Sequence, residues 1–206
     1  GQVDQTALSF LSPAHSPVKV GQVIQYTVRY RNAGAETHQS VRLTLTGYGI
    51  DLSNSTLDLG DVEPGSEVLA TFEGQVNGDG PRGAWAVVHG LLYDASHPAG
   101  DALEWLWEAH RVDKDPPDAV AITNLRATVR PHRAALIGSA LDESGVASVE
   151  LEITGPDGVT SFTCSVTRAG DGRWQCPWNV GGAPHGTRFV LRARATDVLG
   201  HTSDWS

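Results

Sequence analysis

Hydrophobic and polar residues alternate with a period of two along most of this chain. In VIQYTVRYR, residues 23–31, the side chains of Ile24, Tyr26, Val28 and Tyr30 fall on one face, and polar side chains fall on the other. This spacing is typical of a half-buried β-strand with a core side and a solvent side. Helical periodicity is nearly absent, so the pattern predicts an all-β protein.

The first half carries four further strand signals, separated by clusters of Gly, Pro, Asn and Asp. They are VRLTLT (41–46), EVLATFEGQV (67–76), AWAVVHGLLY (84–93) and ALEWLWEAHRV (102–112). The stretch 84–93 is apolar on both faces, which is typical of a central strand in a sandwich.

The second half repeats this style without repeating the sequence. Its predicted strands are residues 120–123, 133–141, 147–154, 160–167, 173–180 and 188–197. Explicit turn signals separate them: GPDG at 155–158, AGDG at 169–172 and GGAPHG at 181–186. Short strands with frequent turns over roughly 100 residues are typical of an immunoglobulin-like sandwich.

The stretch VDKDPPDAV, residues 112–120, indicates a domain boundary. Pro116 and Pro117 cannot donate hydrogen bonds to a sheet, and they stiffen the link. We therefore expect two immunoglobulin-like β-sandwich domains in tandem, at residues 1–114 and 115–206.

Composition narrows the possible partners. The chain has 206 residues, 40% of them hydrophobic, and no stretch approaches the ~18 apolar residues of a membrane span. Its net charge is −9 and no run of Lys or Arg forms a basic stripe, which argues against nucleic acid and against an anionic membrane surface. The absence of Met and of a recognisable signal peptide predicts a processed protein or a fragment of a longer one.

Two groups of segments resemble bacterial surface proteins. VKVGQVIQYTVRYRNAG (18–34) and LDLGDVEPGSEVLATFEGQV (57–76) resemble the CARDB (cell-adhesion-related) type of immunoglobulin-like repeat. VDKDPP (112–117), ALDESGVASVELEI (140–153) and ARATDVLGHTSDW (193–205) resemble bacterial immunoglobulin-like domains appended to secreted enzymes and adhesins. The resemblance implies an extracellular or cell-surface location, and it leaves the activity open because such domains serve different hosts.

Both cysteines lie in FTCSVTRAGDGRWQCPW, residues 162–178. A redox pair needs C-x-x-C at a helix start, and a structural zinc site needs about four ligands at a characteristic spacing; neither is found here. A hairpin that pairs Cys164 with Cys176 centres on Gly170, inside the AGDG turn signal, so the turn and the cysteines require the same register. This predicts a disulfide across the hairpin and an oxidising compartment; the alternative is two reduced, buried cysteines on neighbouring strands.

Carboxylates cluster at the boundary, where Asp113, Asp115 and Asp118 flank Lys114. Calcium takes six to eight oxygen ligands, so these three aspartates are candidate calcium ligands. The alternative is solvated turn chemistry, and no other cofactor is indicated.

The six tryptophans have two interpretations. Trp85, Trp105 and Trp107 lie in strand patterns and are predicted to pack between the sheets. Trp174, Trp178 and Trp205 lie nearer turns or the C-terminus, and they are the candidates for an exposed sugar-binding platform.

No catalytic motif is present in the sequence. Glu104 and Glu108 flank two tryptophans, as in a glycosidase site, but they share one strand face, which predicts a solvent-facing side. We therefore expect no enzyme. The preferred hypothesis is a non-catalytic spacer or adhesion module that contacts neighbouring domains or another surface protein; the alternative is an accessory module that binds a polysaccharide or another ligand.

Overall fold

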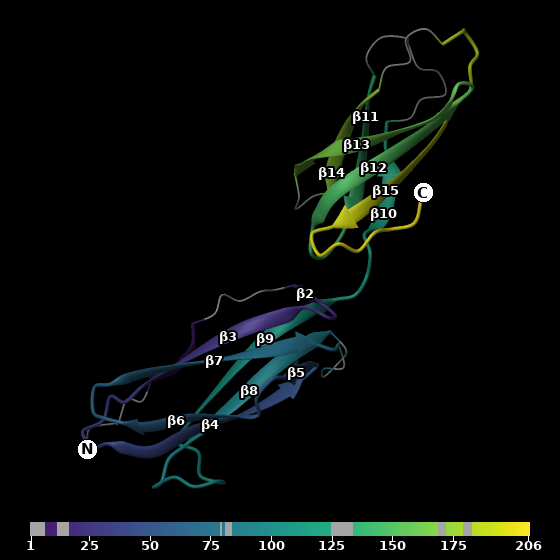
Figure 1. The fold of residues 1–206 in the computed structure, drawn as a ribbon. Coiled ribbons are helices and arrows are strands. Elements are labelled where there is room, and N and C mark those ends of the chain that lie inside the picture. Colours follow the sequence, from purple (N-terminus) through teal and green to yellow (C-terminus); the bar gives the residue numbers. More distant parts are fainter. Residues whose placement is uncertain are drawn as a thin grey trace. The chain divides into compact units, whose positions relative to one another are not determined.

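Figure 1 shows the chain as a computed structural model, which describes residues 7–11, 17–78, 80, 84–124, 134–168, 172–178 and 183–206. The chain divides into two compact units, Gly1–Asp113 and Lys114–Ser206, one residue before the predicted boundary. Every regular element in the described residues is a β-strand, which confirms the predicted all-β class. That part of the chain holds no helix long and apolar enough to cross a membrane.

The first unit is a sandwich of two β-sheets (Figure 1). One sheet has the order β1-β3-β7-β5 and contains β1 (Ala7–Phe10), β3 (Val23–Arg31), β7 (Glu67–Val76) and β5 (Ile50–Leu52). The other has the order β2-β9-β8-β4-β6 and contains β2 (Val18–Lys19), β9 (Glu104–Asp113), β8 (Trp85–Tyr93), β4 (His38–Tyr48) and β6 (Thr56–Val62). Neighbouring strands are antiparallel except β2 and β9, which are parallel.

The core of the first unit follows the alternation in β3. Its apolar set, Ile24, Tyr26, Val28 and Tyr30, is almost fully buried, as predicted. The Tyr26 ring stacks on Phe72 of β7 with the ring centroids 4.8 Å apart. Aromatic stacking of this kind adds to the free energy gained from burying the rings.

β8 occupies the middle of the five-stranded sheet, as its apolar sequence predicted. Its inward side chains pack against the facing sheet, and Gly90 lies directly opposite Leu106 of β9. A Cβ atom at Gly90 would lie 2.7 Å from Cδ2 of Leu106, so the leucine occupies the space that the glycine leaves. Leu106 is 7% exposed, so this contact lies on the side of β9 that turns toward the core.

The second unit has the strand order β10-β11-β14-β13-β12-β15. The strands are β10 (Asp118–Ile122), β11 (Ala134–Leu141), β14 (Arg173–Trp178), β13 (Gly158–Arg168), β12 (Val146–Gly155) and β15 (Val190–Asp197). β13 pairs with β12 up to Cys164 and with β14 from Ser165 onward, so it passes from one layer to the other. The layers enclose a core of buried aliphatic, tryptophan and cysteine side chains.

The predicted disulfide is present. Cys164 of β13 and Cys176 of β14 are joined, with their Cα atoms 4.6 Å apart. The neighbouring pairs Ser165–Gln175 and Val166–Trp174 follow the predicted register. Of the AGDG turn, residues 169–171 lie outside the described residues, and Gly172 has φ of 59°, which favours glycine.

Four strands were not predicted: β1, β2, β5 and β6. Three of them are short, and β6 is interrupted by register shifts against β4, so none shows sustained alternation. The predicted turn GGAPHG and the end of the strand predicted at 173–180 overlap residues 179–182, which lie outside the described residues.

Candidate functional site

Three indole side chains project from the outer side of the five-stranded sheet. Trp85 of β8 is 42% exposed, and Trp105 and Trp107 of β9 are 62% and 58% exposed. The prediction that these three tryptophans pack between the sheets is therefore wrong. β9 does alternate, but its tryptophans face solvent and Leu106 faces the core.

The cause of this inversion lies in β9, which carries apolar residues on both faces. Leu106, in register with Gly90, occupies the space that the glycine leaves, while Trp105 and Trp107, at the opposite parity, turn outward. The same phase turns Glu104 and Glu108 toward the inner side, where both are half-buried. The expectation that these glutamates form a solvent-facing side is therefore wrong as well.

The strand register assembles these tryptophans into one surface. On β8 and β9, Trp85 lies opposite Arg111, His89 opposite Trp107, and Leu91 opposite Trp105. Residues in register on antiparallel strands share a face. We call this surface the aromatic face and define it as Arg42, Thr44, Thr46 and Tyr48 of β4, Trp85, Val87, His89, Leu91 and Tyr93 of β8, and Trp105, Trp107, Ala109 and Arg111 of β9.

The tryptophans of the second unit lie elsewhere than predicted. Trp174 is fully buried and Trp178 is 7% exposed, so neither offers a sugar-binding platform, and that prediction is wrong. Both lie two residues from Cys176 on the same strand and so share its inward direction. The predicted disulfide already implied that Trp174 and Trp178 point inward, because Cys176 on the same strand turns inward to reach Cys164.

Trp205 is half-buried beneath two arginines. The guanidinium carbons of Arg192 and Arg194 lie 4.8 and 4.6 Å from the centroid of its ring. The two arginines also pair with Glu152 and Glu150 of β12 at 2.7 and 2.6 Å. The guanidinium groups cover the ring, which removes Trp205 as an open platform for a sugar.

The three candidate calcium ligands belong to different parts of the fold. Asp113 is the last residue of β9 and is buried in the first unit, opposite Lys19 in register. Asp115 and Asp118 are exposed and belong to the second unit. Calcium binding by these aspartates stays a prediction.

A buried polar cluster follows β8 in the first unit. The Tyr30 hydroxyl lies 2.6 Å from Nδ1 of His38, which lies 3.6 Å from Oδ2 of Asp94. Asp94 Oδ1 accepts the backbone N–H groups of Ser96 and His97 and lies 3.0 Å from Nδ1 of His97. Burial raises the pKa of Asp94, but the hydrogen bonds from His97 and Ser96 outweigh it and hold the pKa below its ordinary value. The cluster anchors the turn that follows β8.

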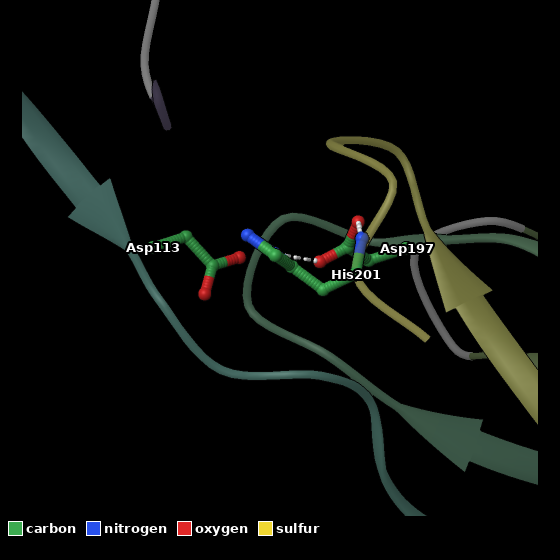
Figure 2. Close-up of side chains that lie close together, drawn as sticks. All are labelled: Asp113, Asp197 and His201. Atoms are coloured by element: carbon green, nitrogen blue, oxygen red, sulfur yellow. Dashed lines mark hydrogen bonds and ion pairs between the residues drawn. The ribbon is translucent and has the colours of Figure 1, made fainter. Parts of the chain in front are cut away.

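The second unit contains a similar turn anchor after β15. Figure 2 shows the Asp197 carboxylate beside the ring of His201, with Oδ2 2.7 Å from Nδ1. Oδ1 of the buried Asp197 accepts the backbone N–H groups of Leu199 and His201, each at 2.8 Å. Each of these Asp–His pairs uses its acceptors to hold backbone donors, which is turn chemistry rather than nucleophile activation.

Tyr26 and Glu108 approach each other inside the first unit. Burial, and then the charge of Glu108, raise the pKa of the Tyr26 hydroxyl. The ring of His110 lies 5.7 Å from that of Tyr26. Tyr26 therefore stays a neutral core residue across the physiological pH range.

Comparison with known proteins found partial structural similarity. No family model matches the chain, and no curated protein matches it. A CARDB domain from Pyrococcus furiosus is 15% identical over 54% of this chain and 90% of that one, with a TM-score of 0.41. Native α2-macroglobulin from Escherichia coli, from domain MG7 to the C-terminus, is 12% identical over 74% of this chain and 23% of that one, with a TM-score of 0.44. A FixG-related protein from Vibrio parahaemolyticus is 19% identical over 54% and 98% of the two chains, with a TM-score of 0.37.

Proposed function

We propose that this chain is a non-catalytic adhesion module of a secreted or surface-attached protein, and that the aromatic face is the surface through which it attaches. The observation that carries the proposal is the outward projection of Trp85, Trp105 and Trp107 from one sheet. Large contiguous apolar patches are uncommon on soluble proteins, and the largest patch on a monomer is often a binding site.

The position of the tryptophans on a sheet supports this function. Side chains on paired strands are held more precisely than side chains on loops, and β8 has a neighbouring strand on each side. Indoles also combine a large contact area with few rotatable bonds, so little conformational entropy is lost on binding. The face is therefore ordered before its ligand arrives.

The disulfide supports the proposed location. Cystine bridges form and persist in oxidising compartments such as the cell exterior, and Cys164–Cys176 is fully enclosed by the second core. The proposed absence of catalysis rests on the Asp–His pairs of the described residues, which are occupied in holding turns.

The proposal is tested by binding of the purified chain to whole cells of the species that encodes it. We expect saturable binding that a Trp105→Ser/Trp107→Ser double variant loses while keeping the wild-type melting profile. Leu69→Ala is the matched control, because Leu69 is 57% exposed on the other sheet of the same unit. Equal binding by the wild type and the double variant would contradict adhesion through this face and favour a role as a spacer between neighbouring domains.

A further inference from the structure

The middle of the aromatic face carries no fixed charge. Its two arginines lie at opposite ends, Arg42 in the row of Tyr93 and Arg111 in the row of Trp85. Arg42 lies in register with the exposed Asp58 of β6, and Arg111 has an interaction within the chain. The three rows between these ends contain no aspartate, glutamate, lysine or arginine. A charged ligand would lose hydration there without meeting an opposite charge, so the middle of the face favours an uncharged ligand.

Apolar and hydroxyl side chains form two adjacent strips on this face. The outward side chains of β9 and β8 that make up the apolar strip are Trp105, Trp107, Ala109, Trp85, Val87 and Leu91. On β4, the three outward side chains from Thr44 to Tyr48 all carry a hydroxyl group, and those of Thr46 and Tyr48 are exposed. Thr44 shares a row with Trp105, and Thr46 shares one with Trp107. The face therefore sets a row of hydroxyl groups alongside a row of indoles.

This pattern matches the two kinds of surface on a sugar ring. A pyranose presents C–H groups on its faces, which pack against a flat indole, and hydroxyl groups at its edge, which exchange hydrogen bonds with other hydroxyls. Trp105 and Trp107 are two residues apart on β9, so their indoles repeat at ~7 Å along the strand. Trp85 lies opposite Arg111, ~20 Å along the strand from Trp105. The tryptophans are therefore placed to follow an extended chain of rings.

The size of the face limits the kind of partner. β8 contributes nine residues, which at ~3.3 Å per residue and ~4.8 Å between strands gives a three-stranded surface of ~400 Å². A stable protein–protein interface buries ~800 Å² on each partner. The face alone is too small for a second copy of this chain or for another globular protein, but it can hold a narrow, linear ligand.

A linear peptide fits this face less well than a glycan does. Extended peptides add to a sheet through main-chain hydrogen bonds at an exposed edge. β8 and β4 each have a neighbouring strand on both sides, so their backbone groups are used inside the sheet. A peptide lying across the face would find side chains but no backbone partners. A glycan has no backbone amides to satisfy, and its hydroxyl groups can bond to the side chains of β4.

We propose that the aromatic face binds a linear polysaccharide of uncharged pyranose sugars. The inference rests on the proposed function and names its ligand. The indoles of Trp105 and Trp107 stack on neighbouring rings, and Trp85 contacts the glycan farther along. Thr46 and Tyr48 exchange hydrogen bonds with the hydroxyl groups of the rings. Because no ion pair forms, the affinity depends little on salt.

The test compares uncharged and acidic polysaccharides. Soluble xyloglucan, glucomannan and mixed-linkage glucan are titrated into the purified chain beside polygalacturonate and alginate, with calorimetry and tryptophan fluorescence as readouts. We expect saturable binding of at least one uncharged glycan, at least about tenfold tighter than either acid. Raising the salt to about 1 M should change that affinity less than about twofold.

Four outcomes of this comparison would overturn the inference. They are tighter binding of the acidic glycans, an affinity that falls steeply with salt, an absence of binding across the panel, and binding to phosphatidylcholine vesicles without binding to any glycan. The last outcome would assign the exposed indoles to a lipid surface.

Single variants separate stacking from hydrogen bonding. Trp107→Ala should weaken binding about tenfold, and Thr46→Val, which keeps the shape of the side chain and removes its hydroxyl, about fivefold. Leu69→Ala and Thr71→Val are the matched controls, because both residues are exposed on the other sheet of the same unit. Wild-type affinity in Thr46→Val would indicate a purely apolar ligand and contradict the proposed hydrogen bonds.

The length of the ligand tests the path along the face. The disaccharide and the hexasaccharide of the bound glycan are compared in Trp85→Ala. This variant should weaken binding of the hexasaccharide and leave that of the disaccharide unchanged, because only a long ligand reaches from the Trp105–Trp107 pair to Trp85. Equal binding of the hexasaccharide by the variant and the wild type would contradict this path.

Failure of this inference can be separated from failure of the proposed function. If cell binding depends on Trp105 and Trp107 and is abolished by protease treatment of the cells but survives periodate oxidation of their glycans, the adhesion function stands and its ligand is a protein. If periodate abolishes the binding and protease does not, a polysaccharide ligand is supported. If the tryptophan variants bind cells as the wild type does, the proposed function itself fails.

Discussion

Trp174 of β14 lies directly opposite Gly138 of β11, and its ring fills the space that a side chain at position 138 would need. Gly138→Ala should therefore destabilise the second unit by about 1–3 kcal/mol, because the added methyl group overlaps a fully buried ring. Urea denaturation measures this change. The control Ile137→Ala, at an exposed position on the same strand, should change the free energy of unfolding much less. A Gly138→Ala variant as stable as the wild type would contradict the packing described.

The disulfide should stabilise the second unit alone. Cys164 and Cys176 close a short loop, which in the chain-entropy model contributes about 3 kcal/mol. The double variant Cys164→Ala/Cys176→Ala should lower the melting temperature of the second unit and leave the first unit unchanged. Mass spectrometry before and after reduction checks the bond directly, and two free thiols in the native protein would refute it.

Truncating an inward and an outward side chain of β9 should have unequal effects on stability. Leu106→Ala should cost about 2–5 kcal/mol, because Leu106 packs in the core against Gly90. Trp107→Ala should cost less than Leu106→Ala, because the Trp107 side chain is 58% exposed and its loss leaves no cavity in the core. Thermal denaturation compares the two variants. A large loss from Trp107→Ala with a small loss from Leu106→Ala would restore the original prediction that the tryptophans pack inside.

Acid should weaken the first unit through Asp94. Its pKa is lower in the folded protein than its unfolded value of about 3.9. The carboxylate therefore stabilises the fold fully above that value, and the contribution is lost as the pH falls through the lowered pKa. Asp94→Asn should reduce stability at neutral pH and flatten its dependence on pH below about 4. The exposed Asp101→Asn, in the same part of the chain, is the control; an unchanged pH profile in the Asp94 variant would count against the hydrogen bonds described.

Trp205 should hold the C-terminal segment against β15. Its contacts with Arg192 and Arg194 contribute roughly 0.5–1 kcal/mol each at a partly exposed site. Trp205→Ala should speed hydrogen exchange at the amides of Ser203 and Ser206, which donate to β15. The amides within β12 should exchange as in the wild type. Unchanged exchange at both serines would show that the backbone hydrogen bonds hold the segment without the ring.

The alternation of residues predicted the strands better than it predicted their faces. β3 has apolar side chains at one parity only, so its buried face followed directly from the sequence. β9 has them at both parities, so its own sequence does not say which set is buried. The inward direction of Trp174 and Trp178 could have been predicted from the sequence, because each lies two residues from Cys176, whose side chain must point inward to form the disulfide.

The aromatic face could not be predicted from the sequence, because strand pairing was not known. Its members come from β4, β8 and β9, far apart along the chain, and their common face is a property of strand pairing. The number of tryptophans suggested an exposed aromatic surface. Because the tryptophans of the first unit were predicted to be buried, that surface was predicted in the second unit instead.

The segment after β15 folds back along that strand, where Ser203 and Ser206 donate to the carbonyl groups of Ala195 and Ala193. β15 stands at the end of its strand order, and an open sheet edge is a template for the addition of strands from other molecules. Those carbonyl acceptors are already occupied by the chain's own backbone. A strand from another molecule would therefore have to displace this segment before it could pair with Ala193 and Ala195 of β15.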